Sequence, residues 1–346
     1  MDSSTLDKIS ELGDLDLALL VSRVAEQHCI FSAAVESIKN LQEELRLSCI
    51  DTFGIQPAVV ECSPQTTVDE FNSSLLVPFN NGSKEAADRH HLLNLPTFEV
   101  DYSPSRDHSP RRFGSIANGI EDLCIAEIII ATRLDTADEC VQVQALELLT
   151  SRRIFTRSSM HVAPKNLLFI AISSSSAPQA KLSRHLNDVF CMSHFHAAED
   201  ALPHTEENNR REKWFPPTFD AEEIQYLQDL TKTVHMTAEI AQYLHNVVVF
   251  LRNSRFVQAG VTATATRQLR SLSLALAPLH GLTYVPPSIV ALAARKIYRH
   301  RLVLATPKTE RSLLWGSHPE AVRLLLEGVT VEDVIEDVLA GLETPL

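Results

Sequence analysis

The stretch from residue 255 to residue 304 begins Arg255-Phe-Val-Gln-Ala-Gly260-Val-Thr-Ala-Thr-Ala265-Thr-Arg-Gln-Leu-Arg270. It continues with Leu279-His-Gly-Leu-Thr-Tyr284-Val-Pro-Pro-Ser-Ile289 and ends near His300-Arg-Leu. Apolar residues three and four apart predict an amphipathic helix on each side of a Gly-containing turn, and Tyr-Val-Pro leads into the second helix. Helical spacing also dominates from residue 220 onward, so we expect an all-α unit in this part of the chain.

Five short apolar runs precede this unit and alternate with helical patterns. The runs are Cys29-Ile-Phe31, residues 58–62, residues 124–131, residues 166–172 and residues 189–195. The helical patterns cover residues 14–26, 38–47, 68–76 and 137–149. Short strands that alternate with helices are typical of a parallel sheet with helices on both faces. The sequence therefore predicts an α/β core with a five-stranded parallel sheet.

Two polar stretches divide the chain. Residues 78–118 are rich in Gly, Pro, Ser and His, and we expect a disordered insert because they offer little apolar surface to bury. The insert is either a tolerated loop or a phosphorylated, partner-binding segment around Ser103, Ser105 and Ser109. Residues 201–219 predict a charged linker. The expected units are a core over 1–200, a helical lid over 220–310 and a helical tail over 311–346.

Composition excludes several classes of protein. The 346 residues are 45% hydrophobic and carry a net charge of −13, which argues against broad nucleic-acid binding. No apolar run is long enough to predict a membrane span, and the acidic N-terminus is unlike a secretory signal. The six cysteines show no CxxC spacing, so we expect reduced, mostly buried thiols. These features predict an intracellular, most simply cytoplasmic, protein.

A family resemblance rests on two segments. Residues 143–156 read Val143-Gln144-Ala-Leu-Glu147-Leu-Leu-Thr-Ser-Arg-Arg153-Ile-Phe-Thr156, and residues 245–305 contain the helix–turn–helix described above. Both resemble AAA+ ATPases of the MoxR and magnesium-chelatase type, with fungal magnesium-chelatase-like proteins as the nearest relatives. The resemblance implies a nucleotide-binding α/β core followed by a helical lid, with ATP and Mg²⁺ as ligands.

The phosphate-binding loop of that family is altered here. The matching run is His28-Cys-Ile-Phe-Ser32-Ala-Ala-Val-Glu36-Ser-Ile38-Lys39-Asn40. Lys39 occupies the place of the family's phosphate-binding lysine, and Asn40 replaces the hydroxyl residue that would bind Mg²⁺. Non-glycine residues stand at the glycine positions, where a positive φ would cost them about 1–2 kcal/mol each. Lys39 and Asn40 are therefore the candidate cofactor-binding residues of a degenerate loop.

The other family motifs also depart from their pattern. The third strand ends in Thr132-Arg133-Leu134 in place of Asp-Glu, and the next carboxylate, Asp135, is expected to cap the helix at 137–149. Serines at 173–176 replace a polar sensor, Val189 replaces the arginine that reaches a neighbouring subunit, and Gly260-Val-Thr-Ala-Thr264 lacks the lid arginine. We assign no catalytic residue.

The leading hypothesis is a degenerate AAA+ protein that acts as a scaffold or interaction partner. A ring shared with active homologues is the assembly that the resemblance implies. The alternative is an atypical ATPase that relies on Lys39. A third reading is a zinc protein that uses His194 and His196 with Cys191 or His185, although further ligands are not evident. In the tail, Glu332, Asp333, Glu336 and Asp337 form an acidic helix face that is either solvated or a docking face for a basic partner.

Overall fold

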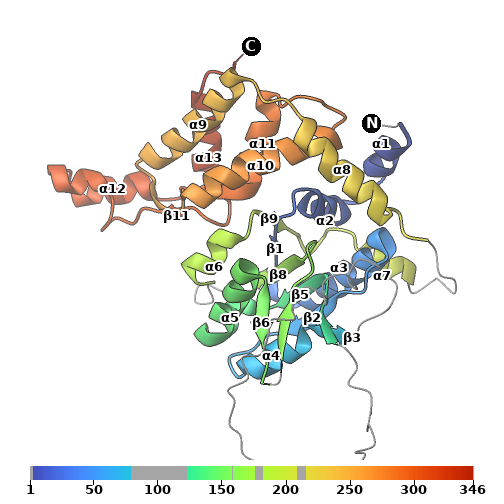
Figure 1. Ribbon diagram of the computed structural model, residues 1–346. Coiled ribbons are helices and arrows are strands. Elements are labelled where there is room, and N and C mark those ends of the chain that lie inside the picture. The colour runs from blue at the N-terminus through green and yellow to red at the C-terminus, as the bar shows by residue number, and fades with distance from the viewer. Residues whose placement is uncertain (1–2, 79–122, 158, 176–181, 209–215, 346) are drawn as a thin grey trace, which may run out of the picture.

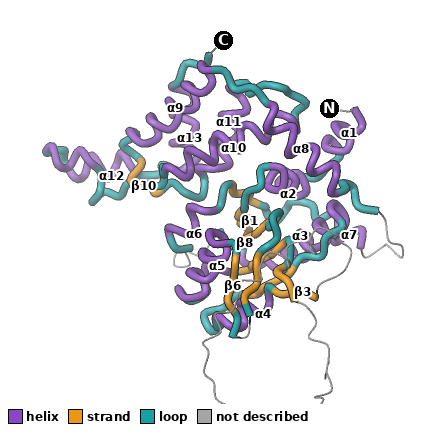
Figure 2. The backbone as a smooth tube through the Cα atoms, viewed as in Figure 1, coloured by secondary structure: helices purple, strands orange, loops and turns teal. Residues whose placement is uncertain are grey.

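A five-stranded parallel sheet forms the centre of the first half of the molecule. The computed structural model describes residues 3–78, 123–157, 159–175, 182–208 and 216–345, so nearly all of the predicted insert lies outside the described residues. The sheet contains β1 (Cys29–Ala33), β2 (Ala58–Glu61), β5 (Ile128–Thr132), β8 (Leu168–Ser174) and β9 (Met192–Phe195). Their order across the sheet is β2-β5-β8-β1-β9, and every pairing is parallel (Figures 1 and 2).

Alternating side chains send the strands' apolar residues to two separate cores. In β5, Ile128 and Ile130 face the core formed with α2 (Asp14–Val24) and α3 (Ile38–Phe53). Ile129 and Ala131 face the opposite core, formed with α4 (Val68–Ser74), α5 (Glu139–Ser151) and α6 (Arg184–Val189). The predicted α/β class, with helices on both faces of a parallel sheet, is confirmed.

Two of the predicted strands differ from the sequence prediction in their boundaries. The apolar run at 124–131 forms parts of two strands, because the extended conformation is interrupted at Ala126 and Glu127. Its first part, β4 (Leu123–Ile125), pairs with β3 (Leu76–Pro78) in a separate antiparallel ribbon. The fifth strand starts at Met192, because residues 184–189 form α6, whose first turn is capped by the Ser183 side chain. A hairpin of β6 (Arg153–Phe155) and β7 (Met160–Val162) follows α5.

The lid consists of four main helices that pack on the α2 side of the core. These are α8 (Ala221–Thr233), α9 (Ala238–Asn253), α10 (Ala263–Leu279) and α11 (Pro287–Tyr298). A short ribbon joins β10 (Val257–Ala259) to β11 (Val303–Leu304). Buried residues of α8–α11 and of α2 belong to one continuous apolar cluster, and α11 also lies against β9 (Figure 1). Lid and core therefore share buried surface.

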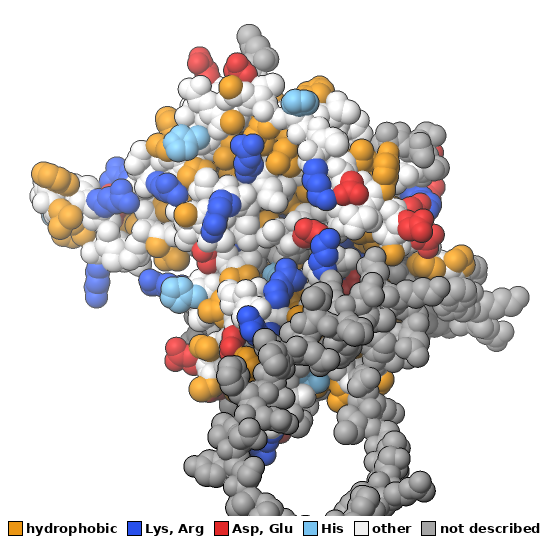
Figure 3. Space-filling view, in the orientation of Figure 1, with side chains coloured by type: hydrophobic (Ala, Val, Ile, Leu, Met, Phe, Trp, Pro, Cys, Tyr) orange, Lys and Arg blue, Asp and Glu red, His pale blue; other side chains and the backbone are white. Residues whose placement is uncertain are grey.

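The acidic face of the tail contacts the chain's own lid. Helix α13 (Val331–Gly341) packs against α9 and α11. Glu336 pairs with Arg295 at 2.5 Å, and Glu332 pairs with Arg299 at 2.7 Å. A third carboxylate, Asp333, accepts from the Thr330 N–H at 2.9 Å in the capping box of α13. Three of the four carboxylates are thus engaged within the molecule, which neither predicted reading of this face anticipated. The tail's other elements, η4 (Arg311–Trp315) and α12 (Pro319–Leu326), project from the body and carry exposed apolar side chains (Figures 1 and 3).

The predicted linker contains a short helix that is attached to the core. Helix α7 (Pro203–Asn208) directs the backbone N–H groups of His204 and Thr205 at Glu44, at 2.9 and 2.8 Å. Glu44 lies on α3 and is fully buried. A remaining helix, α1 (Ser3–Ser10), precedes α2 and was not predicted. Within the described residues, no helix combines the length and hydrophobicity that a membrane crossing requires.

Candidate nucleotide site at the carboxyl edge of the sheet

The loop after β1 has the length of a phosphate-binding loop but a different conformation. Ala34 is extended, with φ −62° and ψ 148°, and Val35–Ser37 form a 3-10 turn that runs directly into α3. The Ser37 N–H donates to the Ala34 carbonyl at 3.0 Å. In a phosphate-binding loop, successive N–H groups point at the anion instead. At least one donor of this segment is thus used within the turn.

The expected backbone strain in this loop is absent. Among the described residues, the non-glycine positions with positive φ are Glu26, Arg133 and Arg152, all outside the loop. Ile38 has φ −58° and its side chain is buried, because it begins α3 and packs into the core. The prediction that non-glycine residues are forced to positive φ here is therefore wrong: the turn avoids the strain by abandoning the glycine-dependent shape.

Lys39 and Asn40 lie side by side in the first turn of α3. Both side chains are exposed, and no ion pair or hydrogen bond joins either one to another described residue. They are close to the carboxyl end of β1, where a phosphate would be held, but no described carboxylate orients the Lys39 ammonium group. The structure places these two candidates together without adding a partner.

The carboxyl end of β5 is closed by an arginine. Arg133 has φ 57° and ψ 34°, and its backbone N–H donates to the Ile172 carbonyl of β8 at 2.8 Å. Leu134–Thr136 then form a 3-10 turn before α5. Arg133 therefore stands where the family resemblance of the sequence implied a metal-binding carboxylate, on a backbone that connects two neighbouring strands.

Asp135 does not cap the following helix. The N-cap residue of α5 is Asp138, whose side chain accepts from the Cys140 N–H at 3.2 Å. Asp135 instead lies in the turn after β5 and is only 6% exposed. The predicted capping role is wrong because the helix begins two residues later than the sequence pattern suggested.

Burial dominates the electrostatics of Asp135. Desolvation raises the pKa of its carboxyl group, although N–H groups of its own turn and of Ser174 partly oppose this. Its Oδ1 atom has no hydrogen-bond partner among the described residues. Asp135 is thus a buried carboxylate, at the carboxyl ends of β5 and β8, with one oxygen that lacks a hydrogen-bond partner among the described residues. It is the strongest indication of a functional site at this edge. Sequence reasoning missed it, and the only available signal was that Asp135 is the first carboxylate after the buried strand.

Ser175, the residue after β8, connects β8 to β1. Ser175 donates to the Ala33 carbonyl through both its N–H, at 2.9 Å, and its Oγ, at 3.2 Å. Ser176, the last of the four serines, lies outside the described residues. The described part of this run therefore has a structural task next to the phosphate loop.

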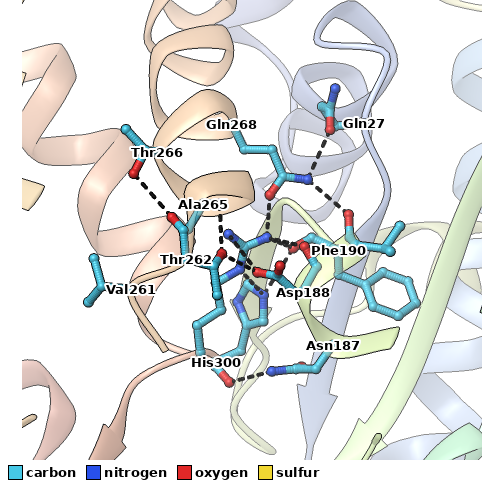
Figure 4. Close-up of polar contacts among 12 residues, drawn as sticks. Gln27, Asn187, Asp188, Phe190, Val261, Thr262, Ala265, Thr266, Gln268 and His300 are labelled. Carbon is cyan, nitrogen blue, oxygen red and sulfur yellow. Dashed lines mark hydrogen bonds and ion pairs between the residues drawn. The ribbon is translucent and has the colours of Figure 1, made fainter. Parts of the chain in front are cut away.

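A polar network fixes the lid to the core at the amino edge of the sheet, where residues 187–190 precede β9 (Figure 4). Arg301, which follows α11 and is 4% exposed, donates to the carbonyls of Asp188 and Phe190 and to the Gln268 side chain. Thr262 Oγ1, at the start of α10, donates to Asp188 Oδ1 at 2.6 Å. Gln268 also donates to the Val189 carbonyl at 2.9 Å. The lid thus holds the segment before β9 through three residues, Arg301, Thr262 and Gln268, for which the sequence predicted no such role.

Burial keeps the histidine of this network neutral. The His300 imidazole stays unprotonated at neutral pH, because desolvation and the neighbouring Arg301 lower its pKa to about 3. Its Nε2 faces the Phe190 carbonyl at 3.1 Å, and its own carbonyl accepts from Asn187 at 3.0 Å. Among the described residues, the acidic partner of Arg301 at this junction is therefore Asp188, whose Oδ1 lies 3.8 Å from Arg301 Nη1.

The histidines proposed as zinc ligands lie at the end of β9. Burial and the nearby Lys296 lower the pKa of His194 to about 4, and His196 Nδ1 lies 3.7 Å from Asp200. Cys191 is fully buried, and burial raises its pKa to about 12. In the described segments, no three His, Cys, Asp or Glu side chains are grouped to hold a metal ion. His185 lies on α6.

Two cavities lie at the opposite, amino edge of the sheet. The larger has a volume of about 560 Å³ and is lined by residues before β1 and β8, together with Ser271 of the lid. The smaller, of about 10 Å³, shares part of this lining and reaches Arg23 and Gln228. Neither includes Lys39, Asn40 or Asp135.

Comparisons with known proteins identify the architecture. No protein-family model matches the chain, and no curated protein matches it. A solved structure from Cytophaga hutchinsonii, described as "a putative ATPase", matches with a TM-score of 0.65 over 99% of this chain and 94% of the other. The sequences are 12% identical, so the likeness concerns the fold. The chain therefore has, over nearly its whole length, the AAA+-like α/β fold with attached helical lid of a protein described as an ATPase.

Proposed function

We propose that this chain is an AAA+-like protein of the MoxR and magnesium-chelatase type that does not hydrolyse ATP and acts as a scaffold or interaction subunit. The main support is the conformation of the loop after β1. Its residues form a 3-10 turn at negative φ, so the loop is shaped as a helix entry. The Glu36 carboxylate would also repel phosphate there.

The rigid attachment of the lid supports the same proposal. Nucleotide-driven proteins use lid movement to close and open their sites. Here Arg301, Thr262 and Gln268 bind the backbone and side chain of residues 188–190 within a buried contact. Lid movement would have to break these bonds and expose a buried guanidinium group, which is costly.

The proposed partners are intact AAA+ homologues in a shared ring. The projecting arm formed by residues 311–326 supports a protein-binding role, because Leu314 and Trp315 are 85% and 88% exposed. Large apolar side chains exposed together often mark interaction sites. Size-exclusion chromatography with a purified intact homologue tests this, and a Leu314→Ser, Trp315→Ser double variant should lose co-elution.

Binding and hydrolysis of Mg²⁺-ATP test the central proposal. Wild type and Lys39→Ala are compared by calorimetric titration and by phosphate release. Lys39 is exposed and unpaired among described residues, so the variant should fold as wild type does. We expect no phosphate release above background and no binding that depends on Lys39. Steady phosphate release that is lost in Lys39→Ala would overturn the proposal.

The alternative is an atypical ATPase, and Asp135 favours it. A buried carboxylate with an open oxygen could bind Mg²⁺ or orient water beside a phosphate held by Lys39. On this alternative, Asp135→Asn and Lys39→Ala would each abolish Mg²⁺-dependent phosphate release.

A further inference from the structure

Two helices of the core end in strained residues that line one cavity. A helix commonly ends in a left-handed residue, which is usually glycine because a Cβ atom is disfavoured there. Helix α3 follows this rule with Gly54, at φ 66°. Helices α2 and α5 do not: Glu26 has φ 52° and Arg152 has φ 57°. Both Glu26 and Arg152 line the cavity of about 560 Å³ at the amino edge of the sheet.

The shared location of these two strained residues indicates that the side chains of Glu26 and Arg152 have a function in the cavity. Glycine at either position would relieve the strain. The presence of charged residues at both sites therefore leads to the hypothesis that their side chains bind a ligand. The two positions are distant in sequence but meet at one cavity, which also contains Gln27, Lys165 and Ser271. Its volume lies in the range of small-molecule sites, which is roughly 300–1,000 Å³.

The charge of the cavity favours an anion. Neither Arg152 nor Lys165 has a described carboxylate within ion-pair distance, although the whole chain carries a net charge of −13. The Arg152 guanidinium is held near the Lys165 backbone by a bond of 3.5 Å to its carbonyl. Glu26 is the acidic group of the lining, and Asp229 lies near enough to Lys165 to interact with its charge.

A third cation lies behind the cavity. The adjoining space of about 10 Å³, enough for one water molecule, is lined by Arg23 as well as by Glu26, Gln27, Arg152 and Lys165. Arg23 is 5% exposed, donates from Nη2 to Glu127 at 2.8 Å and lies over the Phe53 ring, while its Nε and Nη1 have no hydrogen-bond partner in the described segments. A buried guanidinium that is only partly compensated adds to the positive potential of this edge.

We infer that the amino-edge cavity is a binding site for a small organic phosphate. Arg152 and Lys165 hold the phosphate group, and Glu26 accepts hydrogen bonds from hydroxyl groups of the same molecule. The site is separate from Lys39 and Asn40, which lie at the other edge of the sheet. It does not depend on whether the carboxyl edge binds ATP.

The experiment is a calorimetric titration of the full chain with ribose 5-phosphate, ribose and inorganic phosphate. Wild type should bind ribose 5-phosphate, bind inorganic phosphate more weakly and not bind ribose. Arg152→Gly should weaken ribose 5-phosphate binding about 10- to 100-fold, the range for a lost hydrogen bond to a charged group. Because glycine accepts φ 57° without strain, the same variant should unfold at an equal or higher temperature. Loss of affinity therefore cannot result from unfolding.

Two further variants make the result specific. Arg157→Gln, at an exposed arginine of the β6–β7 turn, should bind as wild type does. Glu26→Gly should reduce the difference in affinity between ribose 5-phosphate and inorganic phosphate, because it removes the group that binds the sugar hydroxyls. Absence of binding by wild type at millimolar concentrations, or equal binding by Arg152→Gly, would overturn the inference. Phosphate binding lost in Lys39→Ala but kept in Arg152→Gly would also overturn it and would favour the ATPase alternative.

Discussion

The Nε2 atom of His204 lies 3.0 Å from both carboxylate oxygens of Asp16. Its other ring nitrogen, Nδ1, lies 2.9 Å from Asp51 Oδ2. Only the doubly protonated imidazolium can donate from both nitrogens at once. His204 therefore joins α7 to α2 and α3 as a cation between two carboxylates.

This arrangement predicts a decrease in stability at alkaline pH. Burial alone would lower the pKa of His204, but Asp16, with Asp51 and Glu44, raises it to about 9. The folded-state pKa exceeds the unfolded value of about 6.5, so the contribution is complete below pH 6.5 and is lost as pH rises through about 9. It should be about 2 kcal/mol after solvent screening is allowed for.

Chemical denaturation of wild type and His204→Gln between pH 5 and pH 10 measures the effect. The two free energies of unfolding should converge above pH 9. Burial would raise the pKa of Asp16, but hydrogen bonds from His204 and Ser48 lower it overall, so wild type should also lose stability as Asp16 becomes protonated in acid. His245→Gln, at an exposed histidine of α9, is the control and should leave the pH profile unchanged. A constant difference from pH 5 to pH 10 would contradict the imidazolium assignment.

The His204 contacts mark the limit of what the sequence predicts. The five core strands were located from local apolar runs, because a strand that is buried on both faces consists of a few consecutive apolar residues. His204 instead meets a carboxylate 188 residues away, and no periodicity connects such positions. Asp135 illustrates the same limit at the candidate site: its place in the chain suggested a helix cap, whereas its burial depends on the neighbouring strand β8. Lys39 and Asn40 lie in the first turn of α3, because their position depends only on where that helix begins, and their role in binding a nucleotide stays a prediction.

Gly260 should tolerate no side chain. Its φ is 110°, and a Cβ atom would lie 2.1 Å from the Arg301 carbonyl oxygen, which belongs to backbone and cannot move aside cheaply. We expect Gly260→Ala to lower the free energy of unfolding by about 3 kcal/mol or more, since steric overlap adds to backbone strain. Gly328→Ala is the matched control, because Gly328 has φ 77° but no atom within 4 Å of the added Cβ. The control should cost about 1–2 kcal/mol, and equal costs for both variants would show that the close contact is absent.

Arg301 should be the most sensitive residue of the lid–core junction. Replacement by Met keeps much of the apolar volume but removes the donor that Arg301 supplies to the Gln268 side chain and to the carbonyls of Asp188 and Phe190. We expect a loss of about 3–5 kcal/mol, the usual result when one member of a buried charged network is removed. Limited proteolysis should then cut between core and lid at a lower temperature than in wild type. The control is Arg323→Met, which removes an exposed pair with Glu320 and should change stability by less than about 0.5 kcal/mol. Similar losses for both arginines would argue against a buried junction.

Asp135→Asn should stabilise the protein at neutral pH. Burial raises the pKa of Asp135, so its folded-state pKa lies above the unfolded value of 3.8. The protonated carboxyl group is then favoured by folding, and the stability that it contributes is lost as pH rises through the folded-state pKa. Asn cannot ionise, so its advantage over Asp should be absent in acid and should grow toward pH 8. Denaturation curves at pH 4 and pH 8 measure the difference, and a less stable Asn variant at pH 8 would mean that a cation or donor outside the described residues compensates the charge. A carboxylate that lowers stability is retained most readily for function. If the stabilised variant also loses Mg²⁺-dependent ATP binding, Asp135 belongs to a working nucleotide site, whereas unchanged ligand behaviour leaves it as a remnant in a non-hydrolysing subunit.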